Sequence, residues 1–407
     1  MRDIALLLIL MALGWVVWLR PWLGVLGLAV LNITHPQAAA IGIMKDAPVY
    51  LMFFAFTLLA AGYRMVRNQQ LPTFVFDWRI ACLALLWALF VFTTIHSSVP
   101  WMAWDRLWQT SAVMMAALLA WWLIDTREKL FWLLIVIATS IALYTLKGGY
   151  WAVMTGFHDR VYGPPGSQFY GNNEFAVVVA MNIPLLVLWY RQCGNRQLRG
   201  VLAVMVGLSY VAVISSWSRG GILALAAMTL PLLWHSNRRV RAVLLLGIGI
   251  LGISAFLPED WFTRMGTLTA VQRDESAMGR IEVWRVGLHQ AFEHPLRGVG
   301  FEGWRFANLD TPGYRDWHSA YVQMMAEHGL IGLGLWLALL LGTMLGLARL
   351  SAEGSAWESE TARMLLATLS AYTVGAVFLS IAYWELYFLL IIGTARIYGF
   401  AEAGKPP

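Results

Sequence analysis

Long apolar runs recur along the whole chain and are separated by short polar segments. A membrane-spanning helix needs about 20 mostly apolar residues, whereas a barrel strand gives alternating segments of about 10. The pattern therefore predicts an all-α polytopic membrane protein. The predicted apolar segments are 4–33, 49–62, 80–95, 110–124, 130–146, 174–189, 200–217, 221–234, 242–257, 319–348, 362–381 and 384–400.

The first apolar run, residues 4–33, is longer than one crossing needs, and Pro21 interrupts it. It forms either one broken crossing, which gives twelve crossings in all, or two short ones, which give thirteen with the N-terminus outside. The sequence favours twelve. The run is too deeply embedded in the apolar pattern to be a cleaved signal peptide.

Positive charges orient the predicted helices. Loops rich in lysine and arginine face the cytoplasm in multi-pass proteins. Such loops hold Arg64, Arg67, Arg79, Arg127, Lys129, Arg191, Arg196, Arg199, Arg238, Arg239, Arg241, Arg349 and Arg363, and the tail holds Arg396 and Lys405. The outer face then receives residues 34–48, 96–109, 147–173 and 258–318.

This orientation divides the chain into three predicted parts. Residues 1–257 hold transmembrane helices one to nine, and residues 258–318 form an outer loop with seven arginines. Residues 319–407 hold helices ten to twelve and a cytoplasmic tail. Only the loop is long enough to hold additional structure.

Composition agrees with the membrane class and narrows the function. Hydrophobic residues make up 59% and charged residues 13%, whereas soluble domains carry about 25% charge. The net charge of +6 is explained by topology and does not indicate nucleic-acid binding. Two cysteines make a disulfide framework unexpected. The chain has no Asp-x-Asp, His-Glu-x-x-His or Walker-type phosphate loop, so we expect neither a metal nor a cofactor.

Ser218-Arg219-Gly220-Gly221 lies between two apolar runs with almost no loop, which places Arg219 at the outer membrane edge. The next helix begins here, and its free N–H groups add positive potential. A guanidinium beside a helix N-terminus suits a diphosphate. The alternative is an interfacial arginine whose charge reaches the headgroups.

Three further arginines lie in the predicted outer loops. Arg160 follows His158-Asp159 and precedes a Pro-Pro-Gly turn; it contacts an anion or belongs to a solvated loop. Arg280 begins a predicted helix whose apolar face is Ile281, Trp284, Leu288 and Phe292. That face lies on the membrane surface or covers the bundle. Arg285 assists with the anion or belongs to a solvated stripe.

His318 and Glu327 flank the point where the chain re-enters the membrane. Ionisable groups there are costly unless they face protein or water, so they are candidates for chemistry. A neutral histidine is a natural base near pH 7, and neighbouring arginines would keep it neutral. Nine residues of ideal helix separate the two side chains by about half a rotation, so Glu327 is expected to hold another helix or the loop.

Several of these residues form a recognisable set. Ser218-Arg219-Gly220-Gly221, Gly279-Arg280-Ile281-x-x-Trp284, Gly298-Val-Gly300 and His318-Ser-x-Tyr321, with Glu327, Gly329 and Gly332-Leu333, resemble the O-antigen ligase and polymerase superfamily of bacterial envelope enzymes. The resemblance covers roughly residues 200–345. The stretch from Arg160 to Ser167, with Asn172-Asn173, resembles exosortase-associated O-glycosylation ligases.

The resemblance implies a C-type glycosyltransferase fold of about twelve helices with a periplasmic catalytic loop, in the bacterial inner membrane. It implies a glycan donor on undecaprenyl diphosphate and, for the ligases, a sugar of the lipid A–core as acceptor. By the resemblance, His318 is the base of a metal-independent inverting transfer, and Arg219 and Arg280 hold the diphosphate. Arg160 and Arg285 assist, and Glu327 and Tyr321 support the site.

Three alternatives remain open at the level of sequence. A polymerase would use a second lipid-linked glycan as acceptor, and a protein O-glycosyl ligase would use a protein. A lipid or ion transporter is a different class, which charges in the middle of the bundle would favour. Most charges here are expected at the outer edge, which favours a transferase.

Overall fold

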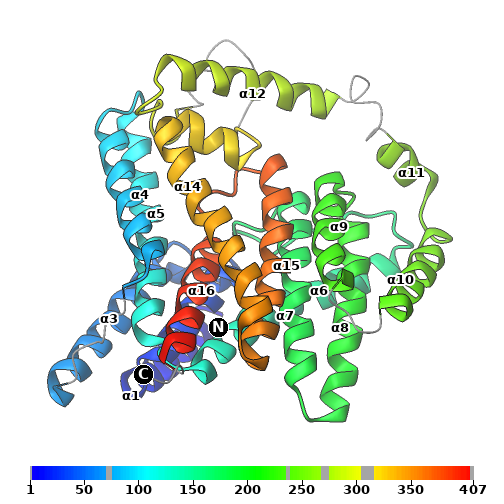
Figure 1. Cartoon of the computed structure of the whole chain (residues 1–407), viewed down its shortest axis with the longest axis horizontal. Helices are drawn as coiled ribbons and strands as arrows, with labels where there is room; N and C mark the ends of the chain where they lie inside the picture. Colours follow the sequence, from blue (N-terminus) through cyan, green and yellow to red (C-terminus); the bar gives the residue numbers. More distant parts are fainter. Residues whose placement is uncertain (1, 70–75, 235–238, 267–274, 304–315, 404–407) are drawn as a thin grey trace.

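The computed structural model describes residues 2–69, 76–234, 239–266, 275–303 and 316–403. Over these ranges the regular structure consists of α-helices and two short 3-10 helices, so the predicted all-α class is confirmed (Figure 1). Eight helices of the described part are long and apolar enough to cross a membrane. Two more apolar helices, α2 and α9, are shorter.

The helix bounds follow the predicted apolar segments closely. The helices before the outer loop are α1 (Arg2–Leu19), α2 (Trp22–Thr34), α3 (Val49–Asn68), α4 (Trp78–Ile95), α5 (Pro100–Leu123), α6 (Arg127–Met154), α7 (Asn172–Gln192), α8 (Arg196–Ser215), α9 (Arg219–Trp234) and α10 (Arg239–Ser254). The helices after them are α11 (Glu259–Gly266), α12 (Glu275–Glu293), α14 (Ala320–Glu353), α15 (Ala356–Phe378) and α16 (Glu385–Ala403). Parts of the predicted outer loop, residues 267–274 and 304–315, lie outside the described residues, as do Arg238 and Lys405.

Helix α7 lies at the centre of the bundle. It packs against α6, α8, α9 and α15, and almost every residue from Phe175 to Leu186 is buried. A helix with neighbours on all sides is apolar all round, as its sequence is. Its one buried amide, Asn182, donates to the carbonyl of Ala138 in α6 at 3.0 Å. Helix α7 therefore lies in the middle of the buried core, to which helices from both halves of the chain contribute.

The first apolar run forms two helices, not one broken crossing. After α1 the chain turns at Arg20-Pro21 and returns as α2, which packs against α1. The carboxylate of Asp3 accepts hydrogen bonds from the N–H groups of Gly42 and Met44, at 3.0 and 3.2 Å. Because these residues follow α2, both ends of the hairpin lie together. This geometry corresponds to two short passes, and it corrects the preference for a single one.

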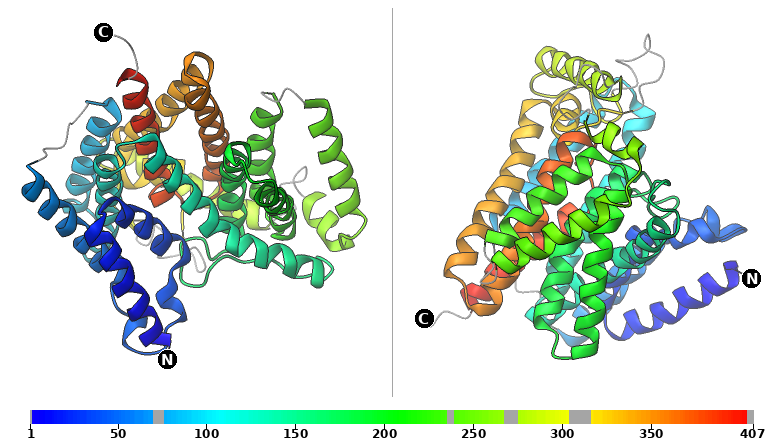
Figure 2. Two further views of the ribbon diagram at one scale, coloured as in Figure 1. Left: turned by 90° about the horizontal axis from the view of Figure 1, so that it is seen from below. Right: turned by 90° about the vertical axis from the view of Figure 1, so that its right-hand side faces the viewer.

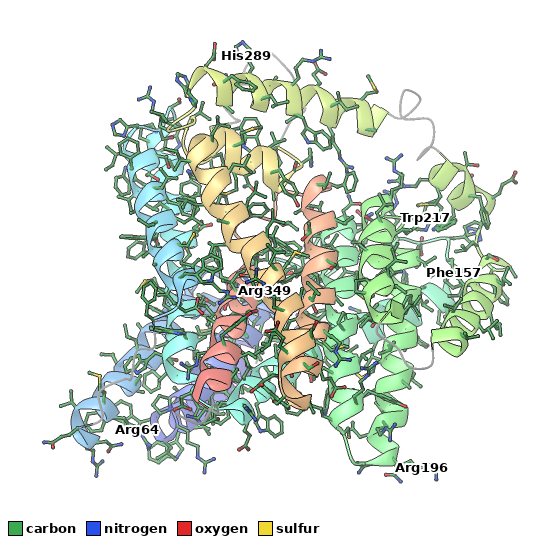
Figure 3. All side chains as sticks on the ribbon, viewed as in Figure 1. Arg64, Phe157, Arg196, Trp217, His289 and Arg349 are labelled. Atoms are coloured by element: carbon green, nitrogen blue, oxygen red, sulfur yellow. The ribbon has the colours of Figure 1, made fainter. Side chains whose placement is uncertain are left out.

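The arginine-rich loops and the outer loop lie at opposite ends of the molecule. Arg64 and Arg196 lie at one end, and His289 of α12 lies at the other (Figure 3). Helix α12 runs across the end of the bundle and packs on α14, which Figure 2 shows from a second side. Arg64 and Arg196, two of the arginines predicted to be cytoplasmic, therefore lie at the end opposite α12.

Helix α14 is interrupted at Gly329, where the backbone is left-handed (φ 70°, ψ −173°). The Gly298-Val-Gly300 segment fills the break. The N–H of Val299 donates to the carbonyl of Ala326, and the following N–H donates to the next carbonyl of the helix, both at 2.9 Å. The N–H after the break donates to the carbonyl of Pro295 at 2.7 Å. The loop thus replaces the helical hydrogen bonds that the break removes.

Replacing Gly329 with alanine is expected to destabilise the protein by about 1–3 kcal/mol, because this backbone conformation is essentially restricted to glycine. An added Cβ would also lie 2.5 Å from the carbonyl oxygen of Pro295. Thermal unfolding in detergent measures the effect. Gly334→Ala is the matched control, since that glycine lies in the same helix with no atom within 4 Å of an added Cβ. Equal unfolding temperatures for the two variants would contradict the account of the break.

Candidate active site

Arg219 is the first residue of α9. Only three residues separate it from the end of α8 at Ser215. The hydroxyl of Ser218 accepts a hydrogen bond from the N–H of Gly221 at 3.0 Å, which caps α9. A side chain at Gly221 would collide with Ala176 of α7, so this glycine allows the two helices to pack at close backbone distance. Arg219 is half-buried at this junction.

Four arginines from four segments gather near the junction. Arg264 of α11 donates from Nε to the carbonyl of Trp217 at 3.0 Å, and the guanidinium of Arg160 lies 6.0 Å from the Trp217 ring centroid. Burial lowers the pKa of Arg264, and the charges of Arg160 and Arg219 lower it further. Burial also lowers the pKa of Arg280, and Arg264 adds to that effect. Such mutual effects require proximity, so the four charges share one region, which we call the arginine cluster.

His318 stands beside the arginine cluster, two residues before α14. Its backbone is left-handed (φ 52°), a conformation that histidine adopts more readily than most residues. Burial lowers the pKa of His318, the carboxylate of Asp316 raises it, and Arg280 lowers it. The net shift is below the ordinary value of 6.5, so the imidazole is neutral near pH 7 and can accept a proton. Burial, more than the arginines, keeps it neutral.

Two carboxylates lie near His318 and Arg280. Burial raises the pKa of Asp316, and the charge on His318 opposes that rise. Glu174, in the first turn of α7, raises the pKa of Arg280 and interacts with Asp316. The site is therefore an alternating arrangement of charges and not a purely cationic patch.

A buried hydrogen-bonded network adjoins His318. The indole N–H of Trp317 donates to Oε1 of Glu327 at 3.0 Å, and the hydroxyl of Tyr383 donates to Oε2 at 2.6 Å. Nε2 of His328 lies 2.8 Å from the Tyr383 hydroxyl, and its Nδ1 lies 2.7 Å from the hydroxyl of Thr93. All five residues are buried. Glu327 thus ties α14 to the segment that carries His318 and to the segment before α16.

Two predicted site residues lie away from this arrangement. Tyr321 donates to the carbonyl of Thr373 at 2.9 Å and packs edge-on against Trp336, so its contacts join α14 to α15. Arg285 is exposed on α12. The structure brings Arg160, Arg219 and Arg280 together with His318, but not Arg285 or Tyr321.

Sequence reasoning missed Arg264, Asp316, Tyr383 and any role for Glu174. A usable signal existed for Arg264: Pro258 followed by Glu259 and Asp260 is typical of a helix N-terminus. The aromatic residues that follow anchor this helix, since the indole of Trp261 donates to a carbonyl at the end of α8. Nothing local marks the others, because their partners are distant in sequence.

Two sequence families match the chain. The family described as O-antigen ligase matches residues 202–337, which include Arg219, Arg280, His318 and Glu327. This match covers a third of the chain and supports a relation to the O-antigen ligase superfamily. A family of unknown function, DUF5935, matches residues 1–195. No curated protein matches the chain.

The O-antigen ligase match supports a ligase- or polymerase-type function, with glycan and lipid substrates in general, for a multi-pass membrane protein. The matched O-antigen ligase region carries α8 to α12 and the first half of α14. It therefore contains His318, three of the four clustered arginines and the break at Gly329. Arg160 and Glu174 come from the region matched by the second family.

Proposed function

We propose that the protein is an O-antigen ligase that moves a glycan from undecaprenyl diphosphate to a sugar of the lipid A–core. His318 is the base, and Arg219 and Arg280 bind the diphosphate, with Arg160 and Arg264 beside them. The arginine-rich loops at the opposite end orient this site toward the periplasm of the inner membrane.

One observation carries the proposal: a neutral, half-buried imidazole lies at the edge of four clustered guanidinium groups. Like charges gathered and partly desolvated are unfavourable unless an anion compensates them. A diphosphate supplies that charge, and guanidinium groups bind its oxygens in bidentate fashion. Nε of Arg280 is buried and has no hydrogen-bond partner among the described residues, so it is available for a ligand oxygen.

The transfer follows from this placement. The acceptor hydroxyl gives its proton to His318, and its oxygen attacks the anomeric carbon of the donor sugar. The bond from that carbon to the phosphate oxygen breaks, and undecaprenyl diphosphate leaves with the electron pair. The arginine cluster stabilises the charge that develops on the leaving oxygen. Asp316 stabilises the imidazolium that forms, as its influence on the pKa of His318 indicates.

Product analysis after deletion of the gene tests the function. We expect lipid A–core without its added glycan, together with accumulation of the carrier-linked glycan, and restoration of both by the wild-type gene. Lipopolysaccharide gels and mass spectrometry of extracted lipids measure the two products. Shortened carrier-linked chains with unchanged core ligation would instead support a polymerase, and loss of glycosylated protein a protein ligase. Lipid flux in liposomes without any glycan transfer would support a transporter.

A further inference from the structure

A cavity of about 640 Å³ lies beside the candidate active site, between the N-terminal helices and the start of α7. Twenty of its 25 lining residues fall within residues 31–174, and the others are Asp316 and four residues of the segment 380–384. The cavity is therefore built mainly by the region that matches the family of unknown function. The proposed transfer uses little of that region.

Planar amides and aromatic rings share the lining of this cavity. The amides belong to Asn32, Gln37, Gln109 and Gln168, and the larger rings belong to Trp108, Tyr170 and Trp384. Sugar rings present apolar C–H faces, which pack on aromatic rings, and hydroxyl groups, which pair with amides that both donate and accept. The lining chemistry thus matches a hydroxylated ring.

Gln37 provides an independent sign of a ligand. Its side chain is only 7% exposed, and its Nε2 lies 3.2 Å from Nδ1 of His35. Its carbonyl oxygen Oε1 is buried with no hydrogen-bond partner among the residues that the structure describes. A buried acceptor without a donor costs free energy, and a ligand hydroxyl donating to it would remove that cost.

The cavity meets the reaction centre through its carboxylates. Asp316 and Glu174 line it, and these two groups interact with His318 and Arg280 respectively. No residue of the arginine cluster lines the cavity. Asp316 and Glu174 are therefore shared between the cavity and the candidate active site.

We infer that this cavity binds a sugar ring of the acceptor and delivers its hydroxyl past Asp316 to His318. The inference rests on the proposed function. An inverting transfer requires the nucleophile to approach the donor ring from the face opposite the leaving group. The cavity is lined by Asp316, two residues from His318, and by no residue of the arginine cluster, so acceptor and diphosphate would occupy different places. The N-terminal region thus supplies the acceptor site of the enzyme.

Saturation-transfer NMR on the full chain in nanodiscs tests this inference, with methyl glycosides of glucose, galactose and N-acetylglucosamine as probes. Transfer to the ring protons is expected for the wild type. Trp108→Ala and Gln37→Met should each weaken binding roughly tenfold, because each removes one direct contact. Trp108 is 65% exposed, so its replacement leaves the fold intact. Trp104→Ala is the matched control: it removes an exposed indole of the same helix that does not line the cavity.

The outcomes separate this inference from the proposed function. His318→Ala is expected to abolish glycan transfer yet keep the NMR signal, because His318 does not line the cavity. The inference is overturned if none of the glycosides shows transfer, or if Trp108→Ala binds them as the wild type does. It is also overturned if farnesyl phosphate, a short isoprenoid probe, binds the cavity in a manner that Trp108→Ala abolishes.

Discussion

Replacing His318 with alanine is expected to lower the rate of glycan transfer roughly 100- to 10,000-fold, the range contributed by a positioned general base. The imidazole is the group beside the arginine cluster that is neutral near pH 7, so its loss leaves the acceptor hydroxyl without a proton acceptor. The measurement is transfer of radiolabelled glycan in membranes that contain equal amounts of each variant. His289→Ala is the control, because the side chain of His289 is 68% exposed on α12, where it pairs with Glu293.

The pH profile distinguishes a base from a structural residue. Burial places the pKa of His318 below 6.5, so the wild-type rate should fall as the pH drops through that lowered value and protonates the base. Asp316 raises the pKa of His318, so Asp316→Asn should move the acid limb to lower pH. If the acid side of the pH–rate profile is the same in Asp316→Asn and the wild type, or if His318→Ala is fully active, then His318 does not accept the proton of the acceptor hydroxyl.

The sequence predicted most helices because membrane burial imposes one requirement on every spanning segment. Apolar length sufficed to find α4, α6 and α8, since lipid leaves the backbone no partner except itself. The same rule was ambiguous for residues 4–33. One Pro-containing run fits a kinked crossing or a hairpin, and the contacts of Asp3 with residues 41–44 decide between them. That decision depends on a tertiary contact that periodicity does not encode.

The candidate site was predictable where a residue marks a membrane boundary. Arg219 and His318 each stand at the first step of an apolar run, so their position alone indicated chemistry. Asp316, Tyr383 and Glu174 belong to the same arrangement, but each depends on partners brought close only by packing of α7, α14 and the segment before α16. For Glu327, the sequence predicted that the side chain would contact another helix or the loop, but it did not predict that the partner would be Tyr383.

Helix α12 shows what hydrophobic periodicity leaves open. The apolar residues Ile281, Leu288 and Phe292 are exposed, as a face on the membrane surface would be, and the prediction left a choice between that surface and the bundle. The contact with α14 includes Val283, which clusters with Val322, and Gly287, where a Cβ would collide with Val322. Arg280 lies at the covered side of the helix, whereas Arg285, five residues later, is exposed.

This difference provides the sharpest test of the arginine cluster. Arg280→Ala is expected to lower glycan transfer about 100- to 1,000-fold, as loss of one preorganised donor to a developing oxyanion does. It should also weaken the binding of undecaprenyl diphosphate, because it removes the buried Nε and the rest of the guanidinium that would bind the phosphate oxygens. Transfer assays and lipid-binding titrations in nanodiscs measure the two effects. Arg285→Ala removes the same charge from the same helix at an exposed position and should change both by no more than about twofold.

Lysine at position 280 separates charge from geometry. Arg280→Lys keeps the positive charge but offers a point donor in place of a planar fork, so it should recover lipid binding more fully than transfer. Equal loss in Arg280→Ala and Arg285→Ala would mean that net charge at the membrane surface, and not the cluster, attracts the donor. Such a result would contradict diphosphate binding at the arginine cluster. The two arginines differ in that Arg280 is partly buried near His318 and Glu174, whereas Arg285 is exposed.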